Sequence, residues 1–282
     1  MSDYEVHELM VARVAAEVDD DGVVVMGSFT PLAYAAYMLA KLTHAPDSFL
    51  VGFDAVGMQP IQLSFTGAEA AAYKGAVCRW GMLTEVNSIH LSNRGGVEAV
   101  SSAQFDGEGA INLSVIGDFD KPKVRLPGGA GAAEVIKMYR KMVAYFGNHN
   151  SRTLVDKVGF VTGTRWKVDA EARAAAGLQP GPIVVVTNLG VLVRDDAQPF
   201  RVESVHPGVD VETIVENTGF ELRVPDSVPE TTVPTDEELQ LLRNSIDPFG
   251  TVKFDFVSGK DRLAYLKGVL DREWKRAEAS LQ

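Results

Sequence analysis

The sequence predicts an α/β fold, in which an open, mostly parallel sheet is flanked by helices and carries some antiparallel additions. Short runs of apolar, largely β-branched residues at 23–27 and 183–187 are typical of buried strands. Helical spacing of apolar residues separates such runs, and this alternation favours parallel strands joined by crossover helices. Apolar segments at 191–193 and 200–205, on either side of a pair of aspartates, indicate an antiparallel hairpin.

The first part of the chain predicts a β-turn-α unit. Residues 4–18 have apolar side chains at helical spacing, and the strand at 23–27 follows them. Pro31 lies where a first-turn proline is tolerated, so a helix is expected over 32–42. The run 49–53 predicts the next strand, and the loop after it is where open α/β sheets place their chemistry.

The middle of the chain is less regular. Strands are expected over 97–105 and 111–116, on either side of a glycine-containing turn, and over 158–162. The segment 135–146 has both helix and strand character. Residues 117–134 are the least regular part, and they hold most of the polar and glycine-rich motifs.

The C-terminal part predicts three helices. Residues 211–218 form the first, with Gly219 as its C-cap. A Thr-x-x-Glu capping box begins the second, over 235–245. The charged amphipathic tail 260–282 is the third and is expected to pack against the domain or a partner. Because no repeat or low-complexity tract interrupts the chain, residues 1–282 are expected to form one domain.

Composition excludes several function classes. Hydrophobic residues make up 46% of the 282 residues and charged residues 23%, as in an ordinary globular enzyme. The formal net charge of -11 argues against non-specific binding to nucleic acid or to an anionic membrane, because both need basic patches. No apolar run reaches the roughly 18 residues of a membrane span.

Cysteine and histidine usage limits the redox and metal chemistry. Cys78 is the only cysteine, so no intrachain disulfide can form, and a reducing, cytoplasmic location is expected. A lone cysteine among Ala, Val and Trp is expected to serve packing. No two histidines stand at ligand spacing, and Asp118 and Asp120 are better explained as a solvated turn, so no metal site is predicted.

The strongest local signal is the glycine-rich segment 125–132, with the sequence RLPGGAGA. Gly128, Gly129, Ala130 and Gly131 leave little side chain between a ligand and the backbone, so several N–H groups can point at an anion or a carbonyl oxygen. A tight turn that needs positive φ explains the same composition equally well. The segment lacks the Lys-Ser/Thr ending of a phosphate-binding P-loop.

His149, in the segment Gly-Asn-His-Asn, is a candidate general base. The alternative is a strand-end histidine whose ring is satisfied by backbone groups. No Gly-x-Ser-x-Gly nucleophile elbow is present. Composition and spacing alone therefore predict an α/β enzyme with an anion-accepting loop.

Seven motifs in chain order carry a resemblance to a known family. They are APD at 45–47, AQxDxxGxxN at 103–112, IGDF at 116–119, FVT at 160–162, GPxxVxxNxGV at 181–191, ENTGF at 216–220 and LRxxIDP at 242–248. Together with the glycine-rich segment, this ordered set resembles the β subunit of class I CoA transferases, especially the glutaconate type. The resemblance covers nearly the whole chain.

The resemblance implies the α/β fold of that family and a partner α subunit of similar fold, in a heterodimer or an α2β2 heterotetramer. It implies an active site at the subunit interface, a coenzyme A thioester as substrate and no permanently bound cofactor. The thioester oxygen would face Gly128, Gly129, Ala130 and Gly131. The resemblance also implies that Phe53 and Gln104 contribute to substrate binding.

The sequence departs from the family at its nucleophile. Glutaconate-type enzymes carry a glutamate shortly after Ala-Pro-Asp, which attacks the acyl-CoA and holds CoA as a glutamyl thioester. Counting forward from Ala45 puts Phe53 at that place, and counting back from Pro60 puts Asp54 there. Some relatives without the glutamate cleave a carbon–carbon bond instead, and the stretch that ends at His149 resembles the ring-opening type.

Four hypotheses follow. The first is a β subunit of a hetero-oligomeric enzyme that cleaves a carbon–carbon bond of an acyl-CoA, by hydrolysis or decarboxylation, with Asp54 and His149 as candidate catalytic residues. The second is a true CoA transferase that uses Asp54 as nucleophile. The third is a non-catalytic subunit that completes the active site of its partner. The fourth, a sugar-binding sensor of related topology, predicts no affinity for CoA.

Overall fold

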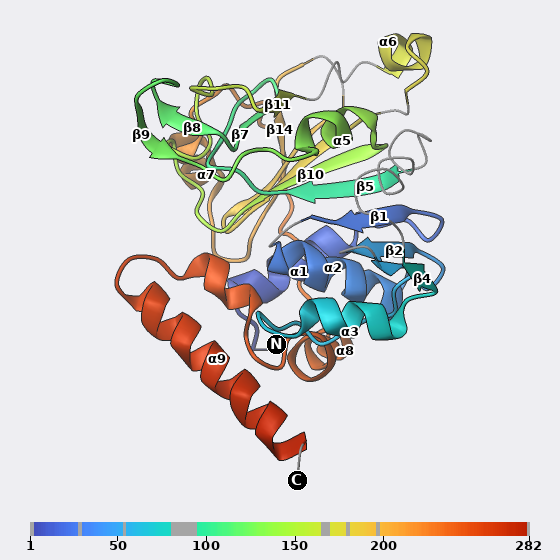
Figure 1. The fold of residues 1–282 in the computed structure, drawn as a ribbon. Coiled ribbons are helices and arrows are strands. Elements are labelled where there is room, and N and C mark those ends of the chain that lie inside the picture. The colour runs from blue at the N-terminus through green and yellow to red at the C-terminus, as the bar shows by residue number, and fades with distance from the viewer. Residues whose placement is uncertain are drawn as a thin grey trace. The chain divides into compact units, whose positions relative to one another are not determined.

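The computed structural model describes residues 3–27, 30–52, 55–79, 95–164, 170–178, 181–195 and 198–280, with Gly95 and Ala170 described by their backbone alone. The chain forms two compact units (Figure 1). Unit 1 combines Met1–Val86 with Val233–Gln282, and unit 2 is the continuous segment Asn87–Thr232. The single domain expected over 1–282 stays a prediction, whereas the mixed α/β class of the fold is confirmed.

The sheet of unit 1 contains the predicted β-turn-α unit. Its strands are β1 (Val23–Met26), β2 (Phe49–Gly52), β3 (Ala55–Val56) and β4 (Cys78–Arg79). β1 and β2 are parallel, and β3 and β4 continue the sheet antiparallel. Gly52 allows close packing at the end of β2, because a Cβ atom there would lie 3.0 Å from the Met26 sulfur and 3.1 Å from the Met58 sulfur.

The helices of unit 1 come from both ends of the chain. They are α1 (Val6–Ala15), α2 (Pro31–Leu42), α3 (Ala68–Gly75), α8 (Asp236–Gln240), the π-helical turn η1 (Leu241–Ile246), the 3-10 helix η2 (Val252–Phe256) and α9 (Asp261–Ser280). The predicted capping box is confirmed, because the Thr235 hydroxyl accepts from the Glu238 N–H at 3.2 Å and the Glu238 carboxylate accepts from the Thr235 N–H at 2.7 Å.

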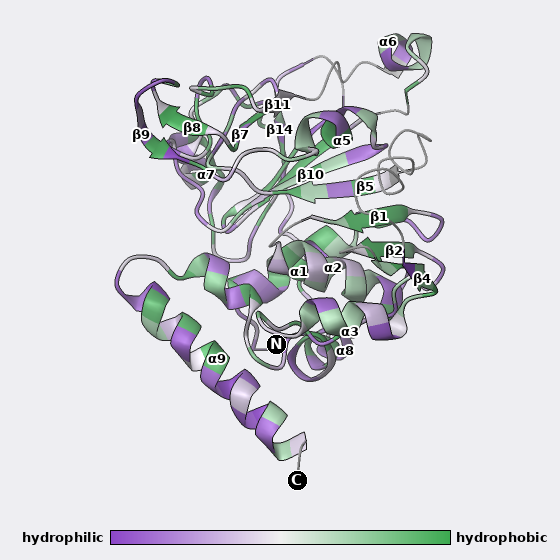
Figure 2. Cartoon of the chain, viewed as in Figure 1, coloured by the Kyte–Doolittle hydropathy of each residue, from purple (hydrophilic) through white to green (hydrophobic). Residues whose placement is uncertain are grey.

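The C-terminal helix α9 is held to unit 1 by a buried carboxylate. Figure 2 shows hydrophilic and hydrophobic residues mixed along α9, as the amphipathic pattern predicts. Glu273 accepts hydrogen bonds from the Phe65 N–H at 2.7 Å and from the N–H and hydroxyl of Thr66 at 3.2 and 2.6 Å. These bonds satisfy backbone donors in the turn that precedes α3.

The sheet of unit 2 combines parallel and antiparallel strands. They are β5 (Gly95–Val100), β10 (Lys141–Phe146), β12 (Ile183–Thr187), β13 (Gly190–Arg194) and β14 (Arg201–Val205), in the order β14-β13-β12-β10-β5. β5, β10 and β12 are parallel, and β13 and β14 form the predicted hairpin. The ambiguous segment 135–146 divides into the end of helix α5 (Ala132–Met138) and the strand β10.

Smaller elements complete unit 2. They are β6 (Gln104–Phe105), β7 (Ala110–Asn112), β8 (Val115–Gly117), β9 (Pro122–Arg125), β11 (Gly163–Thr164), α6 (Ala170–Ala175) and α7 (Val211–Asn217). Phe105 lies at the centre of the core, with its ring 5.7 Å from that of Phe146, 5.8 Å from Phe200 and 6.4 Å from Phe220. Aromatic contacts thus join segments far apart in the sequence.

Two local predictions are wrong. Residues 158–162 are not a strand, because side chains take the backbone donors that a ladder would need: Val158 N–H donates to the Asp106 carboxylate at 3.1 Å and Gly159 N–H to the Gln104 amide oxygen at 3.1 Å. Gly219 does not cap α7 with positive φ. It instead allows close packing, since a Cβ atom there would lie 2.6 Å from the Leu154 carbonyl oxygen.

We expect Glu273→Ala to lower the free energy of unfolding by about 2 kcal/mol, because it removes charged acceptors from buried backbone donors. Chemical denaturation measures the change. Glu278→Ala is the matched control, since Glu278 is exposed and bonds only Trp274 among the described residues. Equal stability of the two variants would contradict the anchoring role of Glu273.

Candidate functional site

The candidate site begins at the carboxyl ends of the parallel strands in unit 2. β5 is followed by the segment that leads to Gln104, β10 by the segment that leads to His149, and β12 by Asn188. Parallel strands end at one edge of a sheet, which is where open α/β folds bind ligands. The Asn188 side-chain oxygen accepts from the His149 N–H at 2.7 Å, so the ends of β10 and β12 are tied together.

The glycine loop presents backbone N–H donors that could bind an oxygen atom of a ligand. Gly128 has φ of 94° and donates its N–H to the Leu113 carbonyl at 2.8 Å, while Ala130 has φ of 44°, the left-handed region that non-glycine residues seldom adopt. The N–H groups of Gly129, Ala130 and Gly131 donate to no atom of the described residues. The loop is solvent-accessible, so these three donors are available to a ligand.

Thr162 supports the glycine loop. Its hydroxyl accepts from the Leu113 N–H and forms a hydrogen bond with the Ser114 hydroxyl, both at 2.8 Å. A Cβ atom at Gly129 would lie 2.4 Å from the Thr162 methyl group, so only glycine fits there without displacing the loop. The two interpretations of the segment, a tight turn and a ligand-binding loop, therefore apply to different residues of the same loop.

Gln104 lies beside this support. Its amide oxygen accepts from the Asn112 side chain at 2.8 Å and from the Gly159 N–H at 3.1 Å. The Asn112 oxygen in turn accepts from the N–H groups of Ser114 and Val115. The Gln104 amide NH2 donates to no atom of the described residues, so the side chain is fixed at its acceptor end and free at its donor end.

His149 is buried and held at both ring nitrogens. Nδ1 lies 2.8 Å from the Thr187 hydroxyl and Nε2 lies 2.9 Å from the Thr218 hydroxyl. Both hydroxyls also face a backbone acceptor, Thr218 the Ile214 carbonyl at 2.8 Å and Thr187 the Gly190 carbonyl at 3.1 Å. A neutral ring therefore donates to one hydroxyl and competes with a carbonyl for the proton of the other. Burial lowers the pKa of His149 to about 4, so the ring is neutral at physiological pH. These contacts favour a positioning role, and its role as a base stays a prediction.

Phe53 and Asp54 lie outside the described residues. The strands on either side are described: Gly52 at the end of β2 pairs with Ala55 at the start of β3. Cys78, expected in the packing, is exposed on β4. Among the residues that the structure describes, no group of three or more His, Cys, Asp or Glu side chains could hold a metal ion, and no helix is long and apolar enough to span a membrane.

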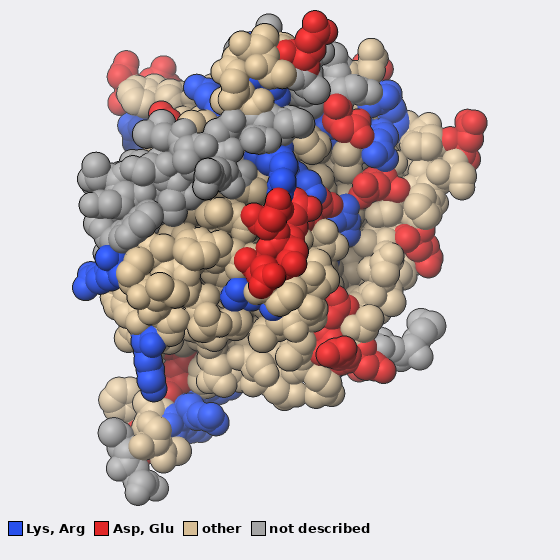
Figure 3. Space-filling model, turned by 90° about the vertical axis from the view of Figure 1, so that its right-hand side faces the viewer, with Lys and Arg blue, Asp and Glu red and all other residues tan. Residues whose placement is uncertain are grey.

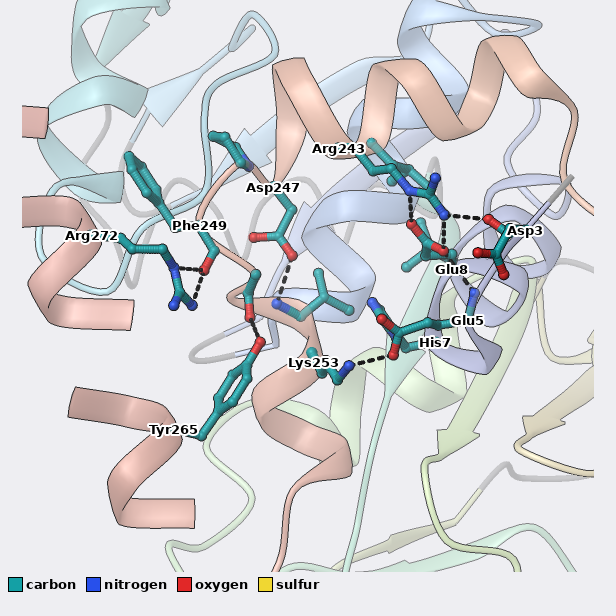
Figure 4. Close-up of a pocket in the computed structure, with 15 residues that line it drawn as sticks. Asp3, Glu5, His7, Glu8, Arg243, Asp247, Phe249, Lys253, Tyr265 and Arg272 are labelled. Atoms are coloured by element: carbon teal, nitrogen blue, oxygen red, sulfur yellow. Dashed lines mark hydrogen bonds and ion pairs between the residues drawn. The ribbon is translucent and has the colours of Figure 1, made fainter. Parts of the chain in front are cut away.

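A cavity of about 610 Å³ lies within unit 1, and ion pairs join part of its charged lining (Figure 4). Arg243 donates to both carboxylate oxygens of Glu8, at 2.6 and 2.8 Å, and Lys253 pairs with Glu5. Burial raises the pKa of Asp247 to about 6, and its carboxylate accepts from the N–H groups that begin η2. The cavity joins α1, η1, η2 and α9, and the predicted site residues that the structure describes lie outside it.

No sequence pattern identified the hydroxyl groups that support the glycine loop and contact His149, or the buried carboxyl group of Glu98. Ser114 and Thr162 are 48 positions apart, and no spacing in the sequence indicates that they meet under the loop. The partners of His149 were equally hidden, since Thr218 is 69 positions away. Glu98 on β5 is buried, and burial raises the pKa of its carboxyl group to about 8. The sequence signal that could have identified Glu98 is a charged residue within an apolar run.

We expect the free energy of unfolding to decrease as the pH is lowered from about 6.5 to 4, and we expect His149 to cause part of this decrease. The unfolded state binds a proton near pH 6.5, whereas the low pKa of the buried ring delays binding in the folded state, so the contribution is fully present above 6.5. His149→Gln should reduce this fall by on the order of 3 kcal/mol in denaturation series. His44→Gln, at an exposed histidine, should keep the wild-type profile; identical profiles for all three proteins would refute the assignment.

Comparison with known proteins gives the family. The family model for coenzyme A transferase matches residues 7–217. The chain is 34% identical over 249 residues to the B subunit of 3-oxoadipate CoA-transferase from Pseudomonas knackmussii, covering 86% of this chain and 94% of that one. It is 28% identical over 256 residues to the B subunit of glutaconate CoA-transferase from Acidaminococcus fermentans, covering 88% and 94%. It is 32% identical over 215 residues to the cholesterol ring-cleaving hydrolase IpdB subunit from Rhodococcus jostii, covering 74% and 79%.

Solved structures agree with the predicted fold. A chain of the decarboxylase AibA/AibB matches with a TM-score of 0.78 and 26% identity, covering 89% of this chain and 98% of that one. A chain of IpdAB from Rhodococcus jostii RHA1 matches with a TM-score of 0.73 and 26% identity, covering 91% of this chain and 100% of that one. Glutaconate CoA-transferase from Acidaminococcus fermentans shares the fold, with a TM-score of 0.76 and 24% identity. The match covers 91% of this chain and 99% of that one. The predicted resemblance is thereby confirmed, and the chain belongs to the coenzyme A transferase family, where it corresponds to the B subunits.

Proposed function

We propose that this chain is the B-type subunit of a hetero-oligomeric enzyme that processes an acyl-CoA thioester, with a related A-type subunit as its partner. The names of similar proteins support the partnership, since the B subunit of 3-oxoadipate CoA-transferase, AibA/AibB and IpdAB each imply two kinds of chain. The substrate class follows from the family. The cytoplasm remains the predicted location.

The proposed reaction is cleavage of a carbon–carbon bond rather than transfer of CoA. The observation that carries this proposal is the absence of a glutamate at the position of the nucleophile, where the two registers give Phe53 or Asp54. An aspartate is one methylene shorter than a glutamate, and misplacement by about 1 Å can cost on the order of 100-fold in rate. The decarboxylase AibA/AibB and the ring-cleaving hydrolase IpdB are similar in structure or sequence, which supports the same conclusion.

The glycine loop suits this chemistry. When a bond to the carbon next to the thioester carbonyl breaks, the electron pair that stays on that carbon delocalises onto the thioester oxygen as an enolate, which a proton then quenches. The three uncommitted N–H groups at Gly129, Ala130 and Gly131 are donors for that oxygen. Their support by Thr162 keeps them in place before the charge develops.

A substitution that adds one methyl group tests the loop. Gly131 has φ of -84° and 3.9 Å of space to the nearest atom of Val135, so Gly131→Ala should leave the melting temperature unchanged. If a ligand approaches the backbone there, the methyl group should lower kcat/KM of the complex at least about tenfold. Gly268→Ala, in α9, is the control and should keep full activity. A fully active Gly131→Ala complex would favour a purely structural turn.

Trapping tests the absence of a covalent intermediate. We expect no modification of Asp54 when the complex of the two subunits is incubated with acyl-CoA and then with hydroxylamine or borohydride, followed by peptide mass analysis. A hydroxamate or alcohol at Asp54 would instead establish the true CoA transferase. If Asp54→Asn and His149→Ala both left turnover unchanged, the chain would be a non-catalytic subunit that completes its partner's site.

A further inference from the structure

The strand that leads into the glycine loop carries a row of positive charges. Lys123 and Arg125 alternate along β9 and so point to the same face, about 6.6 Å from one another, and Lys121 directly precedes the strand. The side chains of all three residues are exposed. Neither lysine makes an ion pair or hydrogen bond through its side chain within the described part of the chain. The two lysines therefore have no ion-pair partner among the residues that the structure describes.

An exposed aromatic pair lies beside this row. Phe119, at the tip of the β8–β9 hairpin, stacks on Phe160 with ring centroids 5.3 Å apart and planes inclined by 16°. The Arg125 guanidinium lies 5.0 Å from the Phe119 ring centroid and donates to the Phe119 carbonyl at 3.0 Å. Phe119 is 52% exposed, although its ring is held on a neighbour. Flat, fixed and accessible groups of this kind are stacking surfaces for a nucleobase.

The position of these groups relative to the glycine loop is fixed by the chain. β9 ends at Arg125, and Leu126 N–H donates to the Ser114 carbonyl at 3.0 Å, directly before the loop begins at Gly128. On the other side, Phe160 lies two residues before Thr162, whose methyl group packs under Gly129. The aromatic pair and the loop thus share both of their supporting segments.

The overall charge of the chain explains why an anionic ligand would need a local group of cations. The whole chain has a net charge of -11, and Figure 3 shows acidic and basic side chains interspersed on the face that it draws. Asp118 and Asp120 flank Phe119 and offset part of the positive charge of the row, and the Asp118 carboxylate accepts from the N–H groups of Asp120 and Lys121, both at 2.9 Å. An anionic ligand cannot rely on the overall field of this protein, so it needs such a row of cations.

We propose that Phe119, Phe160 and the row formed by Lys121, Lys123 and Arg125 bind the nucleotide end of the CoA thioester. The adenine stacks on the exposed part of the Phe119–Arg125 pair, and the phosphate groups lie along the cations of β9. The pantetheine arm then runs toward the glycine loop, where the thioester oxygen meets the free N–H groups. The inference extends the proposed function, because it requires a CoA thioester as the substrate.

Calorimetry on the complex of this chain with its A-type partner tests the proposal, with three probes: CoA, 3′-dephospho-CoA and pantetheine. The double variant Lys121→Gln/Lys123→Gln should weaken CoA binding about tenfold and leave pantetheine binding unchanged, because pantetheine has no phosphate. Phe119→Ala should weaken both CoA and dephospho-CoA about tenfold, and again spare pantetheine. Lys275→Gln removes an equivalent exposed charge on α9 and should bind all probes as the wild type does.

Each other outcome overturns a defined part of the proposal. Wild-type affinity for CoA in both hairpin variants would reject the nucleotide site while leaving the proposed function intact. Equal losses for CoA and pantetheine would mean that the variants disturb the glycine loop instead. Loss of the partner subunit on gel filtration, with CoA affinity retained, would assign the surface to subunit contact. No CoA binding by the wild-type complex would reject the proposed function and this site together.

Discussion

The candidate site depends on the packing of a glycine against a threonine. The Thr162 hydroxyl accepts from the Leu113 N–H and shares a hydrogen bond with the Ser114 hydroxyl, and the methyl group of Thr162 fills the space that a side chain at Gly129 would need. The loop therefore lies on a rigid support, and the N–H groups of Gly129, Ala130 and Gly131 donate to no atom of the described residues. Preorganised donors of this kind require little rearrangement when a charge develops on a bound oxygen.

The sequence predicted those elements whose apolar spacing is regular, and it failed where side chains compete for backbone donors. The runs at 23–27 and 183–187 became β1 and β12, because only backbone ladders satisfy buried apolar strands. Residues 158–162 look equally strand-like, yet Asp106 and Gln104 bind their N–H groups from more than 50 positions away. Composition located the glycine loop, but only the folded chain reveals which of its donors are free.

The histidine at the end of β10 illustrates how a resemblance and a geometry can disagree. The motif around His149 suggested a base, but two threonine hydroxyls occupy its nitrogens, and the same contacts link β10, β12 and the end of α7. A ring that holds three segments together can position the edge of the sheet where a ligand would bind, and this role does not require proton transfer.

The origin of unit 1 from both ends of the chain has a consequence for synthesis. Residues 87–232 are synthesised as one continuous stretch, whereas unit 1 is complete only after residues 233–282 have been made. The contact of Arg243 with Glu8, and the bonds of Glu273 to Phe65 and Thr66, form only after residues 233–282 have been synthesised. Until then the N–H groups of Phe65 and Thr66 lack the carboxylate of Glu273, so the turn before α3 reaches its final form late in synthesis.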